Sequence, residues 1–432
     1  ITNGVVEFDS GPASVGSEVV FESAAASHIT SAFDSNSNKV VIAYTDDPNS
    51  YYGTAVVGTV SNMSISFGTP VVFESASTGY KSATFDSNSN KVVIAYSDGP
   101  SGSDTSRAVV GTVSGTGISF GTPVVFESSE IKYTSVVFDS SNNKIVIAYS
   151  DSGNTEYGTA IVGTVSGTNI SFGTAVVFES GNEGAIFTAA AFDTNSNKVV
   201  IAYRHKANSE YGTAIVGTVS GTGISFGTKV VFNSAESNYM AATFDSTSNK
   251  VVIAYTDNGN SNYGTAIVGT VSGTNISFGT AAVFRASTSI YISSSFDSDS
   301  NKVVIAYTDD SGKASAGTVS GTSISFASPV VFDSNNVIHT ASVFDSNSKK
   351  TVIAYRDLVN SQYGTGIVFA PAFDNTVRGS TASGATAIIQ AGGAVNTLQT
   401  GLTAGQQYFV QTDGTLGLTA ADPSVIAGTA VS

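Results

Sequence analysis

The stretch Phe85-Asp-Ser-Asn-Ser-Asn-Lys-Val-Val-Ile-Ala-Tyr96 occurs, with small changes, seven times along this 432-residue chain. The copies lie 48 to 54 residues apart and begin at Phe33, Phe85, Phe138, Phe192, Phe244, Phe296 and Phe344. A period of about 50 residues is typical of the four-stranded sheet that forms one blade of a β-propeller. The apolar residues show no 3.6-residue periodicity, which argues against a helical solenoid. The repeats therefore predict an all-β, seven-bladed β-propeller.

Each repeat reads as four strands joined by tight turns. In the second repeat the strands are predicted at residues 80–86, 91–96, 108–114 and 118–127, all rich in Val, Ile, Phe, Tyr or Thr. The turns at 86–90 and 114–117 are short and consist of Asp, Asn, Ser, Thr and Gly. Small residues precede each Phe-Asp pair, as Ala83 and Thr84 do here. Because strands converge near a propeller axis, we expect the first strand to form the channel wall.

The seventh repeat is incomplete, and the missing strand is found at the other end of the chain. Residues 344–368 supply three strands and lack the fourth, whereas residues 17–23 match the end of a fourth strand, such as residues 122–128. We expect residues 17–23 to complete the last blade and close the ring, which removes an exposed sheet edge. The propeller domain is then residues 1–369. Residues 370–432 break the repeat and predict a small β-rich module that assembles with other chains.

Composition limits the partners. The chain has 33 acidic and 18 basic residues and a net charge of −15, which opposes binding to nucleic acid or to an anionic membrane surface. Apolar runs such as residues 251–255 are far shorter than the roughly 18 residues of a membrane-spanning helix, so membrane insertion is not expected. There is no cysteine, so disulfides and thiol chemistry are excluded.

The two ends of the blades differ in sequence. The turns at residues 86–90 and 114–117 barely change from repeat to repeat, whereas the loops at the opposite end, such as 46–52, 98–105 and 204–210, vary in length and content. Variable loops on a rigid scaffold commonly carry binding sites. We therefore expect ligands at the variable-loop face.

Aromatic residues recur on that face, five positions before each Phe-Asp pair. They are His28, Tyr80, Tyr133, Phe187, Tyr239, Tyr291 and His339. At the end of the innermost strands they would form a collar around the channel mouth, offering flat apolar faces and polar edges to a glycan or another small polar ligand. Packing between blades is the alternative interpretation, because every repeat carries the ring.

A second set of candidate ligand-binding residues follows each second strand. It consists of Asp46, Asp98, Asp151, His205, Asp257, Asp309 and Asp357. Their carboxylates could accept hydrogen bonds from ligand hydroxyl groups.

The first turn of each repeat has the alternation of a calcium-binding loop, as in Asp34, Asn36 and Asn38. It lacks the central Gly and the closing Glu of such loops, and a plain hairpin turn is the alternative. The sixth repeat, with Asp297, Asp299 and Asn301, is the best calcium candidate. No other cofactor is expected.

Catalytic groups in a symmetric repeat protein usually appear as breaks in the repeat. The breaks are Arg107, His205 and Arg285, which lie in three different repeats, and no catalytic constellation is recognisable. We predict that the chain is not an enzyme. A secreted carbohydrate-active enzyme would require these three residues to line one pocket.

The C-terminal sequence carries a resemblance. Residues 401–417 (Gly-Leu-Thr-Ala-Gly-Gln-Gln-Tyr-Phe-Val-Gln-Thr-Asp-Gly-Thr-Leu-Gly) and 421–430 resemble a segment of structural and tail-associated proteins of marine bacteriophages. The Lys-Val-Val-Ile-Ala-Tyr and Tyr-Gly-Thr-Ala-Ile-Val-Gly-Thr-Val repeats are similar to repeats in the same group and in marine bacterial proteins. The resemblance implies a location on a virion or an extracellular surface and contacts with other virion or filament subunits through 370–432.

Two functional hypotheses follow. In the first, the chain is a tail-fibre or surface protein that assembles as a homo-oligomer and presents the variable-loop face to a host receptor, such as a glycan. In the second, it is a purely structural or decoration subunit of a virion or filament.

Overall fold

The computed structural model describes residues 12–99, 105–181 and 184–372, together with three short strands near the C-terminus. The described residues form β-strands joined by turns and two short 3-10 helices, Ser152–Asn154 (η1) and Asn258–Asn260 (η2), with no α-helix among them. Accordingly, the described part of the chain contains no helix of the length and hydropathy needed to cross a membrane. Residues 14–371 form one compact unit, and residues 1–13 with 372–432 form another. The all-β prediction is confirmed.

The first strands of the seven repeats are Val19–Asp34 (β2), Val71–Asp86 (β6), Ile131–Asp139 (β11), Ala185–Asp193 (β16), Val230–Asp245 (β20), Ile290–Asp297 (β25) and Val337–Asp345 (β30). The second strands are Lys39–Asp46 (β3), Lys91–Asp98 (β7), Lys144–Asp151 (β12), Lys198–His205 (β17), Lys250–Asp257 (β21), Lys302–Thr308 (β26) and Lys350–Asp357 (β31). The third strands are Tyr52–Ser61 (β4), Thr105–Ser114 (β8), Tyr157–Ser166 (β13), Tyr211–Ser220 (β18), Tyr263–Ser272 (β22), Gly312–Ser320 (β27) and Tyr363–Ala370 (β32).

The fourth strand of each repeat is split in two, where the sequence predicts one continuous strand. In the first six repeats its first half is Ser64–Phe67 (β5), Gly117–Phe120 (β9), Asn169–Phe172 (β14), Gly223–Phe226 (β19), Asn275–Phe278 (β23) or Ser323–Phe326 (β28), and in the seventh it is Ser14–Val15 (β1). Its second half is Val124–Glu127 (β10), Val176–Glu179 (β15), Ala282–Thr288 (β24) or Val330–Asp333 (β29), or the beginning of β6, β20 or β2.

The break in the fourth strand has a local cause. Pro123 lacks a backbone N–H and cannot continue the ladder. A Cβ atom on Gly121 would lie 2.0 Å from the carbonyl oxygen of Thr168 in the next repeat, so only glycine fits where the two backbones approach. The predicted strand 118–127 is therefore corrected to β9 and β10.

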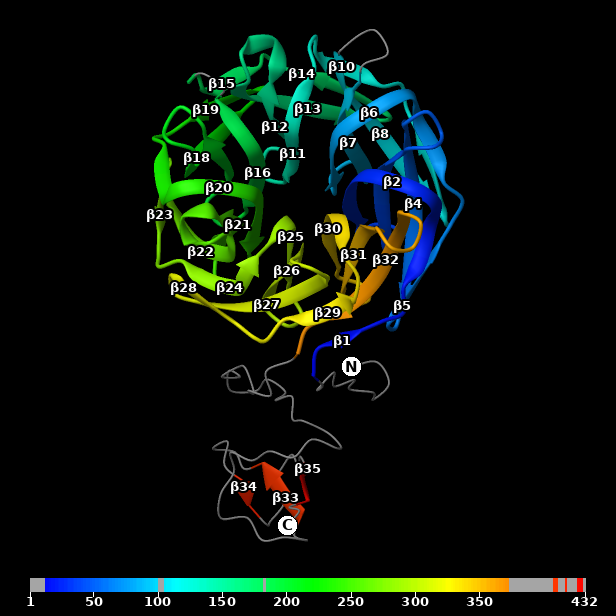
Figure 1. The fold of residues 1–432 in the computed structure, drawn as a ribbon, viewed down its shortest axis with the longest axis vertical. Helices are drawn as coiled ribbons and strands as arrows, with labels where there is room; N and C mark the ends of the chain where they lie inside the picture. The colour runs from blue at the N-terminus through cyan, green and yellow to red at the C-terminus, as the bar shows by residue number, and fades with distance from the viewer. Residues whose placement is uncertain are drawn as a thin grey trace. The chain divides into compact units, whose positions relative to one another are not determined.

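Strand pairing within a repeat is antiparallel and follows chain order. The first strand pairs with the second, the second with the third, and the third with both halves of the fourth, as in β11-β12-β13 with β14 and β15. No sheet within the described ranges closes on itself through strand pairing. Figure 1 shows the sheets of residues 14–371 arranged in a ring, with the first strands innermost. Side-chain packing between neighbouring repeats holds this arrangement together.

The second strands form the core because they are buried on both faces. In β3 every side chain from Val40 to Tyr44 is fully buried. Val40 and Ile42 pack in one apolar cluster with residues of the last repeat, such as Val352, whereas Val41 and Ala43 pack in another with the second repeat. A strand that is buried on both faces reads as a continuous apolar run instead of an alternating one.

The first turn of each repeat is a hairpin stabilised by its aspartate. The Asp34 Oδ1 atom accepts hydrogen bonds from the backbone N–H groups of Asn36 (2.9 Å) and Ser37 (3.0 Å). Asn38 closes the turn at a φ of +56°, a conformation that Asn tolerates better than most residues. The backbone geometry of this turn therefore explains why its sequence recurs in all seven repeats.

The N-terminal strand lies beside the last repeat. In β2, Val19, Val20 and Glu22 pair antiparallel with Gly366, Thr365 and Gly364 of β32, while the second half of β2 pairs with β3. Residues Ser14–Val15 (β1) pair with the end of β32. Strand β2 therefore links the first repeat to the last one.

In the second unit, the described residues form a three-stranded antiparallel sheet. Gln407–Val410 (β33) pairs with Leu416–Gly417 (β34) and with Ile426–Thr429 (β35). The rest of the predicted module 370–432 beyond Ala372 lies outside the described residues.

Candidate functional site

The seven predicted collar residues form a closed circle of ring contacts. Each ring contacts the rings of both neighbouring repeats, with centroids 4.8 to 5.5 Å apart. The His28–His339 contact joins the first repeat to the last at 5.4 Å. Tilted and edge-to-face arrangements predominate, which is the favoured geometry for aromatic pairs.

An unusual backbone conformation orients these rings. All seven collar residues have positive φ angles, from +41° at Tyr80 to +56° at His339. Each lies in a β-bulge, where the register between first and second strands shifts, as between Ser27 and Thr30. Such a conformation costs about 1 kcal/mol or more for a residue with a Cβ atom. All seven repeats accept this free-energy cost, which indicates that the direction of the aromatic rings toward the cavity serves a purpose in the protein.

The collar surrounds a cavity of about 260 Å³. Two tiers of side chains line it: the seven collar residues and the residue that follows each of them. The second tier is Ile29, Lys81, Thr134, Thr188, Met240, Ile292 and Thr340. Aromatic faces in the first tier and hydroxyl groups in the second give the cavity an amphipathic wall.

Lys81 is the one lysine or arginine that lines this cavity. Its ammonium group donates hydrogen bonds to the Thr45 hydroxyl and, at 3.3 Å, to the backbone carbonyl of Thr78. Burial holds its pKa well below the usual range, and the carboxylate of Asp47 opposes that shift. Lys81 was not among the predicted site residues, although it is the one charged residue at a position where the other repeats have Ile, Thr or Met.

The two collar histidines are neutral at physiological pH. Burial, with the nearby positive charges of Lys81 and Arg356, lowers the pKa of His28 to about 3 and that of His339 to about 4. The Nδ1 atom of His28 accepts a hydrogen bond from the backbone N–H of Tyr80 at 3.3 Å. The collar therefore carries no positive charge of its own.

The second set of predicted residues lies elsewhere. None of the seven residues that follow the second strands is among those lining the cavity. Asp151 and Asp257 cap η1 and η2, and Asp357 accepts from two backbone N–H groups. These side chains lie at the junctions between repeats, beside a buried tyrosine that ends the Val-Ile-Ala-Tyr motif. The two sets therefore lie at the same end of the sheets, but only the collar residues line the cavity.

The three breaks in the repeat also lie at these junctions, each at a different one. Arg107 forms an ion pair with Asp98 (2.9 Å), Arg285 with Asp309 (2.5 Å), and His205 with Glu179 (3.1 Å). None of them lines the cavity. The shared pocket that an enzyme would require from these three residues is not formed.

The proposed calcium loop of the sixth repeat has the contacts of a hairpin turn. The Asp297 Oδ1 atom accepts from the backbone N–H groups of Asp299 and Ser300, at 2.9 and 3.0 Å. The carboxylate of Asp299 forms an ion pair with Lys349 of the next repeat at 2.9 Å. Asn301 closes the turn at a φ of +55°.

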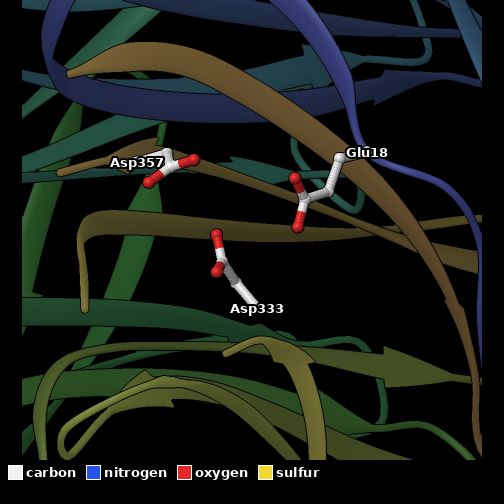
Figure 2. Close-up of side chains that lie close together, drawn as sticks. All are labelled: Glu18, Asp333 and Asp357. Carbon is white, nitrogen blue, oxygen red and sulfur yellow. The ribbon is translucent and has the colours of Figure 1, made fainter. Parts of the chain in front are cut away.

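A different acidic cluster lies at the junction between the last two repeats. Glu18, Asp333 and Asp357 bring one carboxylate oxygen each to within 4.8 Å of one another, and Figure 2 shows the three carboxylates facing a common space. The sequence analysis singled out only Asp357. Two irregularities could have revealed the others: Glu18 stands where other repeats have Pro, Ala or Lys, and Asp333 replaces the usual Glu.

Comparison with known proteins gives a fold and no family. No family model and no curated protein matches this chain. Among solved structures, the fold is similar to that of the BP39L lectin from Burkholderia pseudomallei, with a TM-score of 0.61 and 8% sequence identity. The match covers 82% of this chain and 98% of the lectin chain.

Proposed function

We propose that this chain is a seven-bladed β-propeller that binds carbohydrate in the collar cavity. The observation that carries this proposal is the collar itself: seven aromatic side chains, each held at positive φ, surround one cavity. The similarity of the fold to a lectin supports it. The closed circle of ring contacts from His28 to His339 supports the seven-bladed closure.

The cavity offers the chemistry that a sugar needs. The collar presents ring faces to the C–H surface of a pyranose, and the neutral imidazoles of His28 and His339 exchange hydrogen bonds with hydroxyl groups. Below the collar, the Thr134 hydroxyl is buried and makes no hydrogen bond within the protein. At about 260 Å³ the cavity is slightly smaller than most drug-binding pockets of roughly 300–1,000 Å³, which suits one or two sugar residues.

The position of the cavity suits recognition of a ligand on another surface. Each collar bulge lies at the same end of its sheet as a variable loop, because Ala26, two residues before His28, pairs with Asp46 at the start of loop 46–52. The loops therefore surround the collar and can contact the rest of a longer glycan.

A glycan array probed with the full chain tests carbohydrate binding, followed by calorimetric titration of the best ligand. Tyr239→Asn and Phe187→Asn remove an aromatic face while keeping a residue that tolerates positive φ, and each should weaken binding at least tenfold. Tyr51→Asn is the matched control, because Tyr51 also has positive φ (+61°) but is 55% exposed and does not line the cavity. An array without hits, or equal affinities for all variants, would refute the proposal.

We further propose that the protein acts on a virion, as a tail-associated subunit that faces the host. This part rests on the resemblance of residues 401–430 to segments of marine phage proteins, and it assigns residues 370–432 to assembly. Light scattering of the full chain and of a chain ending at residue 371 tests the assembly role. The full chain should be oligomeric and the shortened chain monomeric; identical masses would contradict it. A structural or decoration subunit remains the competing role, and it would assemble without binding any glycan.

A further inference from the structure

Seven equivalent junctions between neighbouring repeats carry the same buried element. At each one a tyrosine of the second strand is at most 1% exposed: Tyr44, Tyr96, Tyr149, Tyr203, Tyr255, Tyr307 and Tyr355. In four junctions its hydroxyl donates to a glutamate from the fourth strand of the preceding repeat, at 2.9 to 3.2 Å. The junctions thus bring acidic groups into a partly buried environment, and they differ in how that charge is balanced.

Three junctions balance their carboxylates with cationic side chains. Glu179 is only 2% exposed at its side chain and contacts Lys229 at 2.7 Å. Burial would raise the pKa of Glu179, but the hydrogen bond from Lys229, assisted by Gly181 and His205, lowers it overall. Arg107 and Arg285 play the corresponding role for Asp98 and Asp309.

The junction of the last two repeats has the opposite composition. It gathers three carboxylates, of which Asp333 and Asp357 are each only 3% exposed. Glu18 occupies the position that Lys229 occupies in the fourth repeat, so an acid replaces the balancing cation. Burial and the charges of Asp333 and Asp357 raise the pKa of Glu18, and no positive group contributes to that shift among the described residues.

Two buried oxygen atoms at this junction make no hydrogen bond of good geometry within the protein: the hydroxyl of Tyr355 and the Oδ2 atom of Asp333. Burial raises the pKa of Glu18 and of Asp333, and the nearby Tyr355 hydroxyl opposes both shifts. The Oδ1 atom of Asp333 accepts from the backbone N–H of Asn335 at 2.8 Å, and the Oδ1 atom of Asp357 accepts from Val359 and Asn360.

We propose that Glu18, Asp333 and Asp357 bind a calcium ion. An all-oxygen set of three carboxylates, completed by water and the neighbouring Tyr355 hydroxyl, is the ligand type that Ca²⁺ prefers, and it is unsuited to softer metals. The ion supplies the positive charge that Lys229, Arg107 and Arg285 supply at other junctions. Figure 2 shows the three carboxylates directed toward one another, and Glu18 is exposed to solvent whereas Asp333 and Asp357 are buried.

The site has a structural consequence. Glu18 lies immediately before β2, and the other two ligands come from β29 of the sixth repeat and β31 of the seventh. A bound ion would link the N-terminal strand to the last two repeats, where the ring closes. Calcium is therefore expected to stabilise ring closure, independently of any ligand in the collar cavity.

Calorimetric titration of the EDTA-treated full chain with CaCl₂, paired with thermal unfolding, tests this proposal. The native chain should bind Ca²⁺ and gain several degrees in Tm, and equal concentrations of Mg²⁺ should not replace it. Glu18→Gln should weaken Ca²⁺ binding at least tenfold. Glu22→Gln is the matched control: Glu22 lies four residues after Glu18, in β2 at the first junction, and its substitution should leave Ca²⁺ affinity unchanged.

Glu18→Lys provides the sharpest variant, because it copies the arrangement around Lys229. This exposed substitution should raise Tm in EDTA and abolish the Tm increase with Ca²⁺. A native chain whose Tm is the same in Ca²⁺ and EDTA would overturn the proposal. So would an unchanged Ca²⁺ response in Glu18→Lys, or an equal loss of affinity in Glu22→Gln.

Discussion

The imidazole rings of His28 and His339 contact each other at 5.4 Å and join the first repeat to the last. Both rings lie in the collar, where the five other repeats have tyrosine or phenylalanine. Both are buried enough that their pKa values fall to about 3 and about 4. The contact between the first and last repeats is therefore also the most acid-sensitive part of the collar.

Replacing both histidines with tyrosine should reduce the acid sensitivity of folding. Between the ordinary histidine pKa of 6.5 and the depressed folded values, the unfolded chain binds protons that the folded chain does not. The contribution of the two neutral histidines to the free energy of unfolding is complete above pH 6.5 and is lost as the pH falls toward 4. From pH 7.5 to 4.5 the His28→Tyr, His339→Tyr chain should lose about 5 kcal/mol less unfolding free energy than the native chain, because each histidine accounts for about 2 pH units at about 1.4 kcal/mol per unit. Denaturant unfolding at both pH values measures this, and identical losses would contradict the pKa assignment.

Glycine should be better tolerated than alanine in the collar. Tyr239 has a φ of +46°, which costs an alanine about 1 kcal/mol and a glycine almost nothing. Tyr239→Gly should therefore be about 1 kcal/mol more stable than Tyr239→Ala. At Tyr211, a strand position of ordinary φ, the usual order with alanine more stable is expected as the control. Urea unfolding measures the stability of the Gly and Ala variants at Tyr239 and Tyr211. The same order of stability at both sites would argue against backbone strain at Tyr239.

The buried tyrosine hydroxyl should contribute to stability at those junctions where it donates a hydrogen bond to a carboxylate. The Tyr203 hydroxyl donates to Glu179 at 3.0 Å, and both side chains are buried. Tyr203→Phe removes one donor from a buried carboxylate and should cost about 1.5–3 kcal/mol. Tyr255→Phe is the control, because Asn233 stands in place of the glutamate and the change should cost less than 1 kcal/mol. Equal costs in guanidinium unfolding would show that the carboxylate is irrelevant.

The N-terminal strand should contribute as much as an internal fourth strand. Phe21 is 6% exposed and packs on Tyr44 and Phe67, and Phe73 occupies the equivalent place one repeat later. Phe21→Ala and Phe73→Ala should each cost about 3–5 kcal/mol, the range for large core truncations. Val20→Ala, at an exposed position of the same strand, should cost less than 1 kcal/mol. A negligible effect of Phe21→Ala on thermal unfolding would mean that β2 is not part of the core.

Much of the repeat could be predicted because its strands and turns depend on residues that are close together in the chain. The apolar run Val92-Val-Ile-Ala-Tyr96 predicts a strand buried on both faces, and the Asp86 turn follows from hydrogen bonds within five residues. The collar positions were also predictable, since a ring recurs at a constant distance before each Phe-Asp pair. The positive φ of these residues was not, because nothing in an aromatic residue type indicates a left-handed backbone.

The side-chain partners at the junctions between repeats could not be predicted from the sequence. Asp98 and Asp357 occupy the same place in their repeats, yet one is paired with Arg107 and the other lies among carboxylates. The partners come from different strands: Arg107 lies in the third strand of the same repeat, β8, whereas Asp333 lies in the fourth strand of the preceding repeat and Glu18 immediately precedes β2. A repeat pattern aligns equivalent positions but does not say which side chains of neighbouring copies meet.

The period, the first three strands of each repeat, the turns and the seven aromatic positions follow from the residues alone, because short-range hydrogen bonding and two-sided burial leave a local pattern. Three features become visible only in the folded chain: the rings enclose one cavity, the strand-end acids lie between repeats, and Glu18 lies beside Asp333 and Asp357. Glu18 and His28 each lie more than 300 residues before their partners Asp333 and His339, and they meet because each repeat packs on the next until the first and last become neighbours.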